Sequence, residues 1–199
     1  MSPRPSVEAE RRSDALRATW ELITEVGYRH VRISDIAARA GTSTGTIHYY
    51  FDSKEDLLDG AFRFAVDDAH RRSVQALGTL ADPWERFTAL IDVHLPRGDV
   101  KREWLIWLQL WNEAAVRPDL RELNKIYYGR WIDLVVDVVR DGQRTGQFRD
   151  VVARDFVVRF LAMMDGLVIQ LAMDSSDLDL DRLRALLIGF ADDQLRVPQ

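Results

Sequence analysis

Residues 33–58, ISDIAARAGTSTGTIHYYFDSKEDLL, contain the pattern that decides the fold. Apolar residues at helical spacing predict a first short helix that opens at Ser34 and ends at Gly41, because glycine takes a left-handed C-terminal position without steric cost. A second short helix, capped by Ser43 or Thr42, is expected to follow. Two short helices joined by a tight glycine-containing turn are typical of the helix-turn-helix, whose second helix enters the major groove of DNA.

The second helix of this pair divides into a packing face and an outward face. Ile47 and Phe51 lie one turn apart and are expected to pack on the first helix. The small and polar residues that remain are suited to close approach to DNA and to hydrogen bonds with phosphates and bases. A capping pattern at Ser53 begins the next helix and places Lys54 near a phosphate. The predicted DNA-binding residues are Ser34, Ser43, Thr44, Gly45, Thr46, His48, Tyr49, Tyr50 and Lys54.

Residues from about 10 to 60 resemble the DNA-binding domain of the tetracycline-repressor (TetR) family of transcriptional regulators. The matching segments are 20–27, 33–37, 40–41, 43, 45–47, 49–51 and 53–55. Thr44 stands where a basic residue is frequent and His48 where tyrosine is more common, so base contacts at these positions are not carried over. The resemblance implies an operator DNA partner and a helical C-terminal domain with an effector cavity.

The rest of the sequence predicts an all-α fold of about nine helices, because apolar residues recur at helical spacing and no convincing strand pattern occurs. A chain of 199 residues, of which 47% are hydrophobic, can bury a sizeable core. We expect residues 1–52 to form an N-terminal arm and the helix-turn-helix domain. Residues 53–199 are expected to form a helical regulatory and dimerisation domain.

Several absences from the sequence narrow the class of protein. There is no cysteine, which excludes disulfides and cysteine-based metal or redox chemistry. The start, MSPRPSVEAE, contains no apolar stretch that could act as a signal peptide. The most apolar later segment, 156–173, is interrupted by Arg159, Asp165 and Gln170, which argues against a membrane span. We therefore expect a cytoplasmic protein.

The net charge of −5 conflicts at first sight with DNA binding, because DNA-binding domains are often basic. We expect the positive charge to be concentrated near the DNA face, where two subunits acting together would need only a modest number of phosphate contacts each. The basic residues that could form this group are Arg4, Arg11, Arg12, Arg29, Arg32, Arg39 and Lys54.

Aromatic residues recur at helical spacing in the C-terminal part of the chain. Trp104, Trp107 and Trp111 share one face of a predicted helix, and Tyr127 and Trp131 continue the periodicity in the next helix. Such spacing is usual for core residues. The alternative is a ligand pocket with aromatic walls, since small-molecule sites between helices are mostly apolar.

Asp165 lies among apolar residues at positions 161, 162, 168, 169 and 172 of its own predicted helix. A carboxylate on such a face is costly to bury unless it is paired or hydrogen-bonded. Two roles remain open: a structural hydrogen bond or ion pair, for example with Arg130, and a counter-ion for a cationic effector held by cation–π contacts. The predicted ligand-binding residues are Trp104, Trp107, Trp111, Tyr127, Trp131 and Asp165.

Residues 104–148, WLIWLQLWNEAAVRPDLRELNKIYYGRWIDLVVDVVRDGQRTGQF, and 160–173, FLAMMDGLVIQLAM, are similar to the regulatory half of one branch of the TetR family. That branch includes the choline-responsive repressor of the betaine pathway. The resemblance implies no particular ligand. It adds a quaternary ammonium compound or a polyamine to the candidate effectors, beside acyl and aromatic compounds.

Two apolar stripes near the C-terminus predict a homodimer contact. Pairing two such helices from each subunit would build a four-helix bundle around a twofold axis. An intrachain core is the alternative. The predicted dimer residues are Phe156, Phe160, Met164, Leu167, Leu171, Leu183, Leu187 and Phe190.

An enzyme is not expected, because no phosphate loop, nucleophile elbow or paired carboxylates stand out. No cofactor or metal is expected either, since His30, His48, His70 and His94 share no metal-ligand spacing. We predict a ligand-responsive repressor that leaves a palindromic operator when a small molecule binds the C-terminal domain. The alternative is an architectural or activator protein that binds DNA without an effector.

Overall fold

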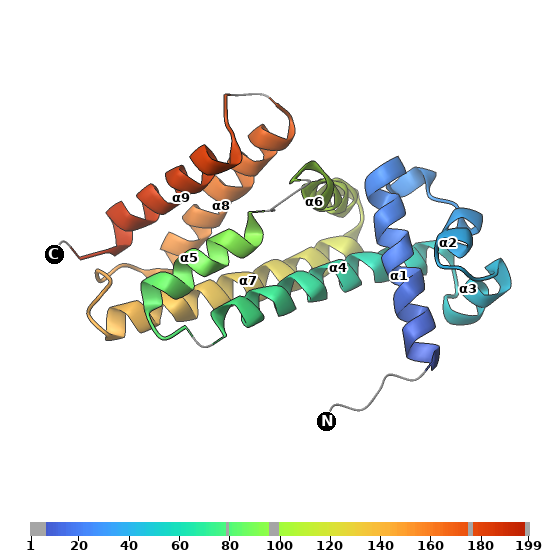
Figure 1. The fold of residues 1–199 in the computed structure, drawn as a ribbon, viewed down its shortest axis with the longest axis horizontal. Helices are drawn as coiled ribbons and strands as arrows, with labels where there is room; N and C mark the ends of the chain where they lie inside the picture. The colour runs from blue at the N-terminus through green and yellow to red at the C-terminus, as the bar shows by residue number, and fades with distance from the viewer. Residues whose placement is uncertain (1–6, 79, 96–99, 175–176, 198–199) are drawn as a thin grey trace. The chain divides into compact units, whose positions relative to one another are not determined.

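Nine α-helices and one short 3₁₀-helix make up the secondary structure of residues 7–78, 80–95, 100–174 and 177–197, which the computed structural model describes (Figure 1). No strand occurs within these ranges, where Phe148 and Arg196 form an isolated bridge. The all-α prediction is therefore confirmed. The elements are α1 Val7–Val26, η1 Tyr28–His30, α2 Ile33–Arg39, α3 Thr44–Tyr50, α4 Lys54–Leu77, α5 Pro83–His94, α6 Val100–Val116, α7 Pro118–Arg144, α8 Ala153–Ala172 and α9 Leu180–Leu195.

These elements fall into two compact units. Unit 1 comprises Met1–Asp68 and Leu105–Asn124, and unit 2 comprises Ala69–Trp104 and Lys125–Gln199. The helices α4, α6 and α7 each contribute residues to both units. The division at residue 53 stays a prediction, because compactness groups the first part of α4 with the N-terminal helices. The predicted N-terminal arm and Arg4 lie outside the described residues.

In unit 1, α2 and α3 form the predicted helix-turn-helix. Gly41 has a φ of +64°, so the turn uses the left-handed conformation that glycine adopts readily. The Ser43 side chain caps α3 by accepting a hydrogen bond from the Thr46 amide at 3.1 Å. Ile47 and Phe51 are buried, as their spacing predicted.

The start of α2 differs from the prediction. Arg32 is the N-cap residue, it makes no capping bond with its side chain, and Ser34 lies inside the helix. The Ser34 hydroxyl donates instead to Asp35 Oδ1 at 3.2 Å. Ser34 does not cap the helix, because it is the second helical residue and the N-cap position falls on Arg32.

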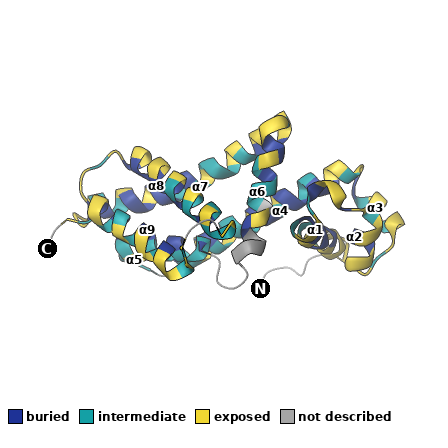
Figure 2. Ribbon diagram, turned by 90° about the horizontal axis from the view of Figure 1, so that it is seen from above, coloured by how far each residue is buried: buried dark blue, intermediate teal, exposed yellow. Residues whose placement is uncertain are grey.

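In unit 2, α5, α8 and α9 pack around phenylalanine rings. The Phe160 ring centroid lies 5.1 Å from Phe87 and 5.9 Å from Phe156, and Phe190 stacks on Phe156 at 6.2 Å. The starts of α5 and α9 are fixed by Asp82 and Asp179, which accept hydrogen bonds from backbone amides in the first turn. Buried and exposed residues alternate around the long helices (Figure 2), as expected of amphipathic helices.

The predicted dimer stripes turn out to be mainly intrachain core. Phe156, Phe160, Met164, Leu183 and Leu187 are at most 3% exposed within the single chain, while Leu167, Leu171 and Phe190 are half-buried. A side chain already covered by its own chain has little surface left for a second subunit. For the five buried residues this burial favours the intrachain alternative, and their assignment to the dimer contact stays a prediction, because helical spacing shows that a face is buried and not what covers it.

Candidate functional site

The predicted DNA-facing residues lie in unit 1: Ser34 on α2, Lys54 at the start of α4 and the others on α3 or at its N-cap. Thr44, Gly45, His48 and Tyr49 are exposed, and Tyr49 is the most prominent, with 73% of its surface accessible. The Tyr49 ring stands edge-on to Tyr50, with centroids 5.0 Å apart. This short helix therefore presents hydroxyl, imidazole and phenol groups to solvent, which suits contacts with phosphates and base edges.

Two of the predicted DNA-binding residues also serve the fold of α3. The Ser43 hydroxyl lies 3.0 Å from the Thr46 hydroxyl and accepts from the Thr46 amide. At the next helix, Ser53 accepts from the Asp56 amide at 3.0 Å, so the predicted cap of α4 is present. The Lys54 ammonium donates to the Arg29 carbonyl at 3.4 Å, which holds it beside η1.

The basic residues expected near the DNA face are only partly available to it. Arg39 binds Glu25 at 2.7 Å and Glu21 at 3.2 Å, and these charge-assisted bonds raise the pKa of Arg39 and tie α2 to α1. Arg29 forms an ion pair with Glu113 at 3.3 Å. The predicted cluster is therefore reduced, because carboxylates of unit 1 engage two of its members.

A polar network that the sequence pattern did not reveal joins η1, α4 and the α6–α7 connection within unit 1. Arg117 donates hydrogen bonds to the Asp59 carboxylate from both terminal nitrogens, at 3.1 and 2.6 Å, and also donates to the Tyr28 hydroxyl. Tyr28 donates to Asp59 at 3.2 Å and stacks on Phe62. Burial is the main reason why the pKa of Tyr28 is raised, followed by the charge of Asp59. We call Tyr28, Asp59 and Arg117 the Arg117 network.

In unit 2, Asp165 of α8 meets a neutral partner. Tyr128 of α7 donates its hydroxyl to Asp165 Oδ2 at 2.6 Å. Burial raises the pKa of Asp165 to about 6, and the hydrogen bond from Tyr128 opposes this shift only in part. Arg130, the partner suggested by the sequence, instead places its guanidinium 4.9 Å from the centre of the Tyr127 ring. The hydroxyl supplies the carboxylate with a hydrogen bond but does not neutralise its negative charge.

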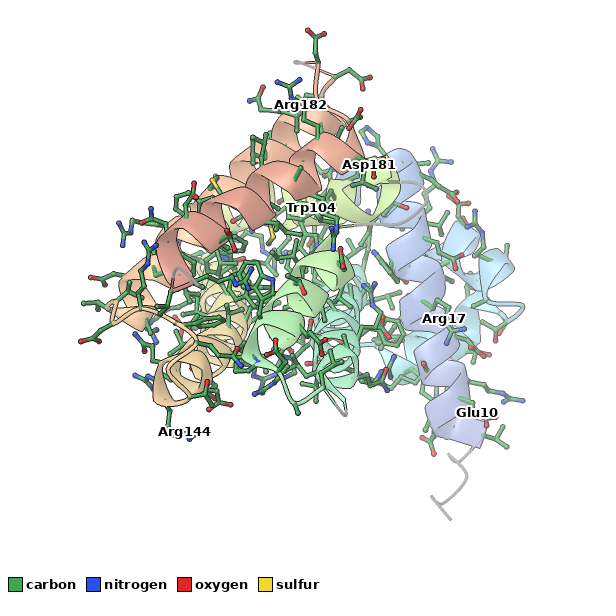
Figure 3. The ribbon with its side chains drawn as sticks, turned by 60° about the vertical axis from the view of Figure 1, so that its left-hand side comes forward. Glu10, Arg17, Trp104, Arg144, Asp181 and Arg182 are labelled. Atoms are coloured by element: carbon green, nitrogen blue, oxygen red, sulfur yellow. The ribbon has the colours of Figure 1, made fainter. Side chains whose placement is uncertain are left out.

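A second cluster in unit 2 is organised around His94, the last residue of α5. Trp131 of α7 donates its indole N–H to His94 Nε2, and the two rings stand nearly perpendicular with centroids 4.2 Å apart. Trp104, labelled in Figure 3, donates its indole N–H to the His94 carbonyl at 3.4 Å. Burial lowers the pKa of His94 to about 4, and the positive charge of Arg72 adds to the effect. The imidazole is therefore neutral near pH 7.

The two clusters of unit 2 are adjacent along α7. Tyr128 and Trp131 are three residues apart, which places them on one face of the helix. We call Trp104, Tyr128, Trp131 and Asp165, together with His94, the α7 cluster. It contains aromatic faces and one poorly compensated carboxylate, the combination that suits an organic cation.

The residues predicted to form one ligand site are divided between the two units. Trp104, Tyr127, Trp131 and Asp165 belong to unit 2, whereas Trp107 and Trp111 belong to unit 1. Trp111 donates to the Asn124 side chain at 3.2 Å within that unit. The sequence interpretation missed Tyr128 and His94. Tyr128 carried a usable signal, because an acceptor on the Asp165 face requires a donor from a neighbouring helix.

Among the described residues, no helix combines the length and the apolar character that crossing a bilayer requires.

Comparison with known proteins identifies families for both parts of the sequence. Residues 15–61 match the family described as bacterial regulatory proteins, tetR family. Residues 83–196 match the family described as BetI-type transcriptional repressor, C-terminal. The transcriptional regulator BetI 1 of Chromohalobacter salexigens is 31% identical over 97% of this chain and 94% of its own length. BetI of Rhizobium meliloti is 30% identical over 98% of this chain and 94% of its own length.

Solved structures agree with this assignment. A transcriptional regulator from Saccharomonospora viridis, crystallised in complex with choline, is 39% identical and superposes with a TM-score of 0.88, covering 95% of this chain and 99% of the other. A TetR-family regulator from a Rhodococcus species is 26% identical with a TM-score of 0.78, covering 92% and 97% of the two chains. Since the curated relatives are named as regulators, the expectation of a non-enzyme is supported. The chain belongs to the TetR family of DNA-binding, ligand-responsive transcriptional repressors, and its C-terminal domain is of the BetI type.

Proposed function

We propose that this repressor responds to a quaternary ammonium compound of the choline type, bound at the α7 cluster. The observation that carries the proposal is Asp165, a largely buried carboxylate whose partner is the neutral hydroxyl of Tyr128. An ionised carboxylate in such surroundings is costly unless a cation joins it. The choline complex of the regulator from Saccharomonospora viridis supports the same class of ligand.

The aromatic members of the α7 cluster favour a quaternary ammonium ion over a metal or a small hydrated cation. Tryptophan faces attract cations through their negative quadrupole, most strongly when water is excluded. A quaternary ammonium group has no N–H to satisfy, so aromatic faces and one carboxylate are sufficient partners. In the alternative, a DNA-binding protein without an effector, Asp165 would have only the structural hydrogen bond from Tyr128 to offset the cost of its burial.

On the DNA side, α3 is the proposed recognition helix and Tyr49 its main exposed contact. Tyr49→Ala is expected to weaken operator binding broadly, and Lys54→Ala to lower the salt dependence by about one unit of slope. Thr44→Ala is expected to change sequence preference more than affinity. A repressor with this domain must reach chromosomal DNA, which is why we place its action in the cytoplasm.

Repression also requires a dimer, because one helix-turn-helix reads too few bases for useful affinity. We place the contact on the outward faces of α8 and α9. Val158 and Leu186 are 45% and 44% exposed there. On the same helices, a Cβ added at Gly166 or Gly189 would have no neighbouring atom within 4 Å. No side chain of this subunit therefore covers these two glycines, and a helix of a second subunit could approach them closely.

The experiment that tests the effector is a ligand titration followed by tryptophan fluorescence and thermal unfolding. The panel contains choline, glycine betaine, a polyamine, an acyl-coenzyme A ester and a planar aromatic cation. Choline is expected to raise the unfolding midpoint in a saturable way, since it binds the folded state. Asp165→Asn is expected to abolish this effect, while Asp137→Asn, which changes an exposed residue of α7, retains it. Stabilisation by an acyl ester and not by choline would contradict the proposal.

A further inference from the structure

The two indoles of the α7 cluster share one anchoring residue. Trp131 donates to the imidazole of His94, and Trp104 donates to the backbone carbonyl of the same residue. The donors come from different helices, Trp104 from α6 and Trp131 from α7, while His94 ends α5. Within unit 2, one residue therefore connects the end of α5, Trp104 of α6 and Trp131 of α7 through the aromatic side chains themselves.

The hydrogen bonds around His94 define its tautomer. Nδ1 lies 2.9 Å from the Leu90 carbonyl, one turn earlier in α5, so this nitrogen carries the hydrogen. Nε2 is left with a lone pair and accepts from Trp131. A protonated imidazole would place two N–H groups in contact, and burial keeps that form unfavourable, as the lowered pKa shows. His94 Nε2 therefore stays unprotonated, and able to accept a hydrogen bond, over the physiological pH range.

An anchored indole N–H restricts how the ring can turn. The N–H lies in the ring plane, so fixing its direction removes the rotation that would exchange an edge for a face. Cation–π attraction acts at the face of the ring and not at its edge. A ring fixed in this way does not lose orientational freedom again when a ligand binds.

We infer that His94 is a positioning residue for the effector site, which acts by holding the Trp131 indole through Nε2 so that the ring face stays available to a quaternary ammonium ion. This inference rests on the proposed function. It also has a consequence for ligand specificity. The indole N–H of Trp131 already donates to His94, and the Tyr128 hydroxyl already donates to Asp165. Neither donor is available to a ligand carboxylate, which disfavours glycine betaine, the carboxylate analogue of choline, at Trp131 and Tyr128. The positive charge of Arg72 also reaches His94 and acts in the opposite direction, so the preference attributed to His94 concerns these two donors.

The test compares His94→Gln with His94→Leu. Glutamine can offer an amide oxygen near the position of Nε2, whereas leucine has similar bulk without an acceptor. The first readout is the choline dissociation constant by calorimetry. The second is the indole N–H resonance of Trp131 in protein labelled with ¹⁵N-tryptophan, assigned with Trp131→Phe. Operator affinity and the unfolding midpoint of each variant without ligand show that it is folded.

We expect His94→Leu to weaken choline binding about tenfold, the usual scale for one lost hydrogen bond, and His94→Gln to restore most of it. The preference for choline over glycine betaine should fall in His94→Leu, since the Trp131 donor is then free. In a Trp131→Phe background, His94→Leu should have little further effect, because the interaction being removed is already absent. This double-variant comparison remains informative even if the single leucine variant is destabilised.

The two readouts separate failure of this inference from failure of the proposed function. Equal loss of choline affinity in both His94 variants, or a Trp131 resonance that does not move in His94→Leu, would overturn the positioning role. A wild-type protein that fails to bind choline, but whose Trp131 resonance moves in His94→Leu and not in His94→Gln, would overturn the proposed function. It would support the anchoring of Trp131 by His94.

Discussion

At the scale of single residues, the buried carboxylate of Asp165 lowers the stability of the folded protein while providing the proposed effector contact. Burial raises the pKa of its carboxyl to about 6, well above the ordinary value of 3.8. The folded protein therefore binds a proton more tightly than the unfolded chain between these two values, and the contribution of Asp165 to stability is lost as the pH rises through about 6. Near pH 7 the ionised carboxylate costs stability, and a cationic effector would recover this cost on binding.

Asp165→Asn should therefore stabilise the protein at neutral pH. The amide keeps an acceptor for Tyr128 and carries no charge, so the free energy of unfolding at pH 7 is expected to rise by about 3 kcal/mol. The gain should shrink toward pH 4, where the wild-type carboxyl is protonated. Denaturant unfolding of both proteins at pH 4 and pH 7 measures this. The titration of His94 is common to both proteins and cancels in the comparison. A gain of the same size at both pH values, or a loss at pH 7, would contradict this account of Asp165.

At the scale of elements, the close packing of α7 depends on a glycine. A side-chain carbon at Gly142 would lie 2.1 Å from the ring of Phe148, which is buried. A side-chain carbon added at Gly129, on the same helix, would have no neighbouring atom within 4 Å. The two glycines therefore differ in packing while sharing the entropic cost of glycine in a helix.

Gly142→Ala is expected to destabilise the protein by about 1–3 kcal/mol through overpacking, and Gly129→Ala to stabilise it by up to about 1 kcal/mol through helix propensity. Chemical denaturation of the two variants beside the wild type is the measurement. If Gly142→Ala were as stable as Gly129→Ala, the contact with Phe148 would not exist as described.

The Arg117 network is the element-scale candidate for transmitting the effector signal. It fastens η1 and α4 to the connection between α6 and α7 within unit 1. Because α4, α6 and α7 also supply residues to unit 2, a change of these helices on effector binding would reach the network along continuous backbone. Breaking the network should loosen the coupling between effector and operator without removing either binding site.

Arg117→Met is expected to reduce the ratio of operator dissociation constants with and without choline at least threefold, a coupling change of about 0.6 kcal/mol or more. Arg144→Met, at the exposed end of α7, serves as the control. Operator titrations at zero and saturating choline give the ratio for each protein. An unchanged ratio in Arg117→Met would show that the signal does not pass through this network.

Helical spacing and capping residues were enough to predict the elements. The cap by Ser43, the turn at Gly41 and the burial of Ile47 all follow from local chemistry, whereas the start of α2 was misplaced and η1 was not predicted. The polar networks could not be predicted in the same way. Tyr28 and Asp59 are 31 residues apart and Arg117 lies 58 residues beyond Asp59, so no local pattern connects them. His94 was missed for the same reason, since its partner Trp131 is 37 residues away.

At the scale of the whole molecule, repression depends on two subunits that hold two recognition helices at a fixed spacing, about 34 Å or a multiple of it. The stripes that sequence reasoning assigned to the dimer contact are largely used inside the chain, as the burial of Phe156 and Leu187 shows. We propose that the second subunit contacts the outward faces of α8 and α9. Their exposed apolar residues and open glycines are typical of surfaces where helices of two subunits approach closely.

Leu186→Glu is expected to convert the dimer to monomers at micromolar concentration, because an unpaired carboxylate would have to be buried in the contact. Operator affinity should fall with it. Val74→Glu, which changes an apolar residue of α4 with 48% exposure, is the matched control and should remain dimeric. Sedimentation velocity distinguishes the two outcomes. A Leu186→Glu protein that sediments as a dimer would exclude this face of α9.

The most direct test of the whole account is release of operator DNA by choline. An operator would first be selected from random duplexes by the wild-type protein, labelled, and followed by fluorescence anisotropy as choline is added. We predict release of the DNA from the wild type and from Asp137→Asn, and no release from Asp165→Asn, which still binds the operator. DNA that stays bound to the wild type at saturating choline, or equal release from Asp165→Asn, would contradict the claim that this repressor senses a quaternary ammonium ion through Asp165.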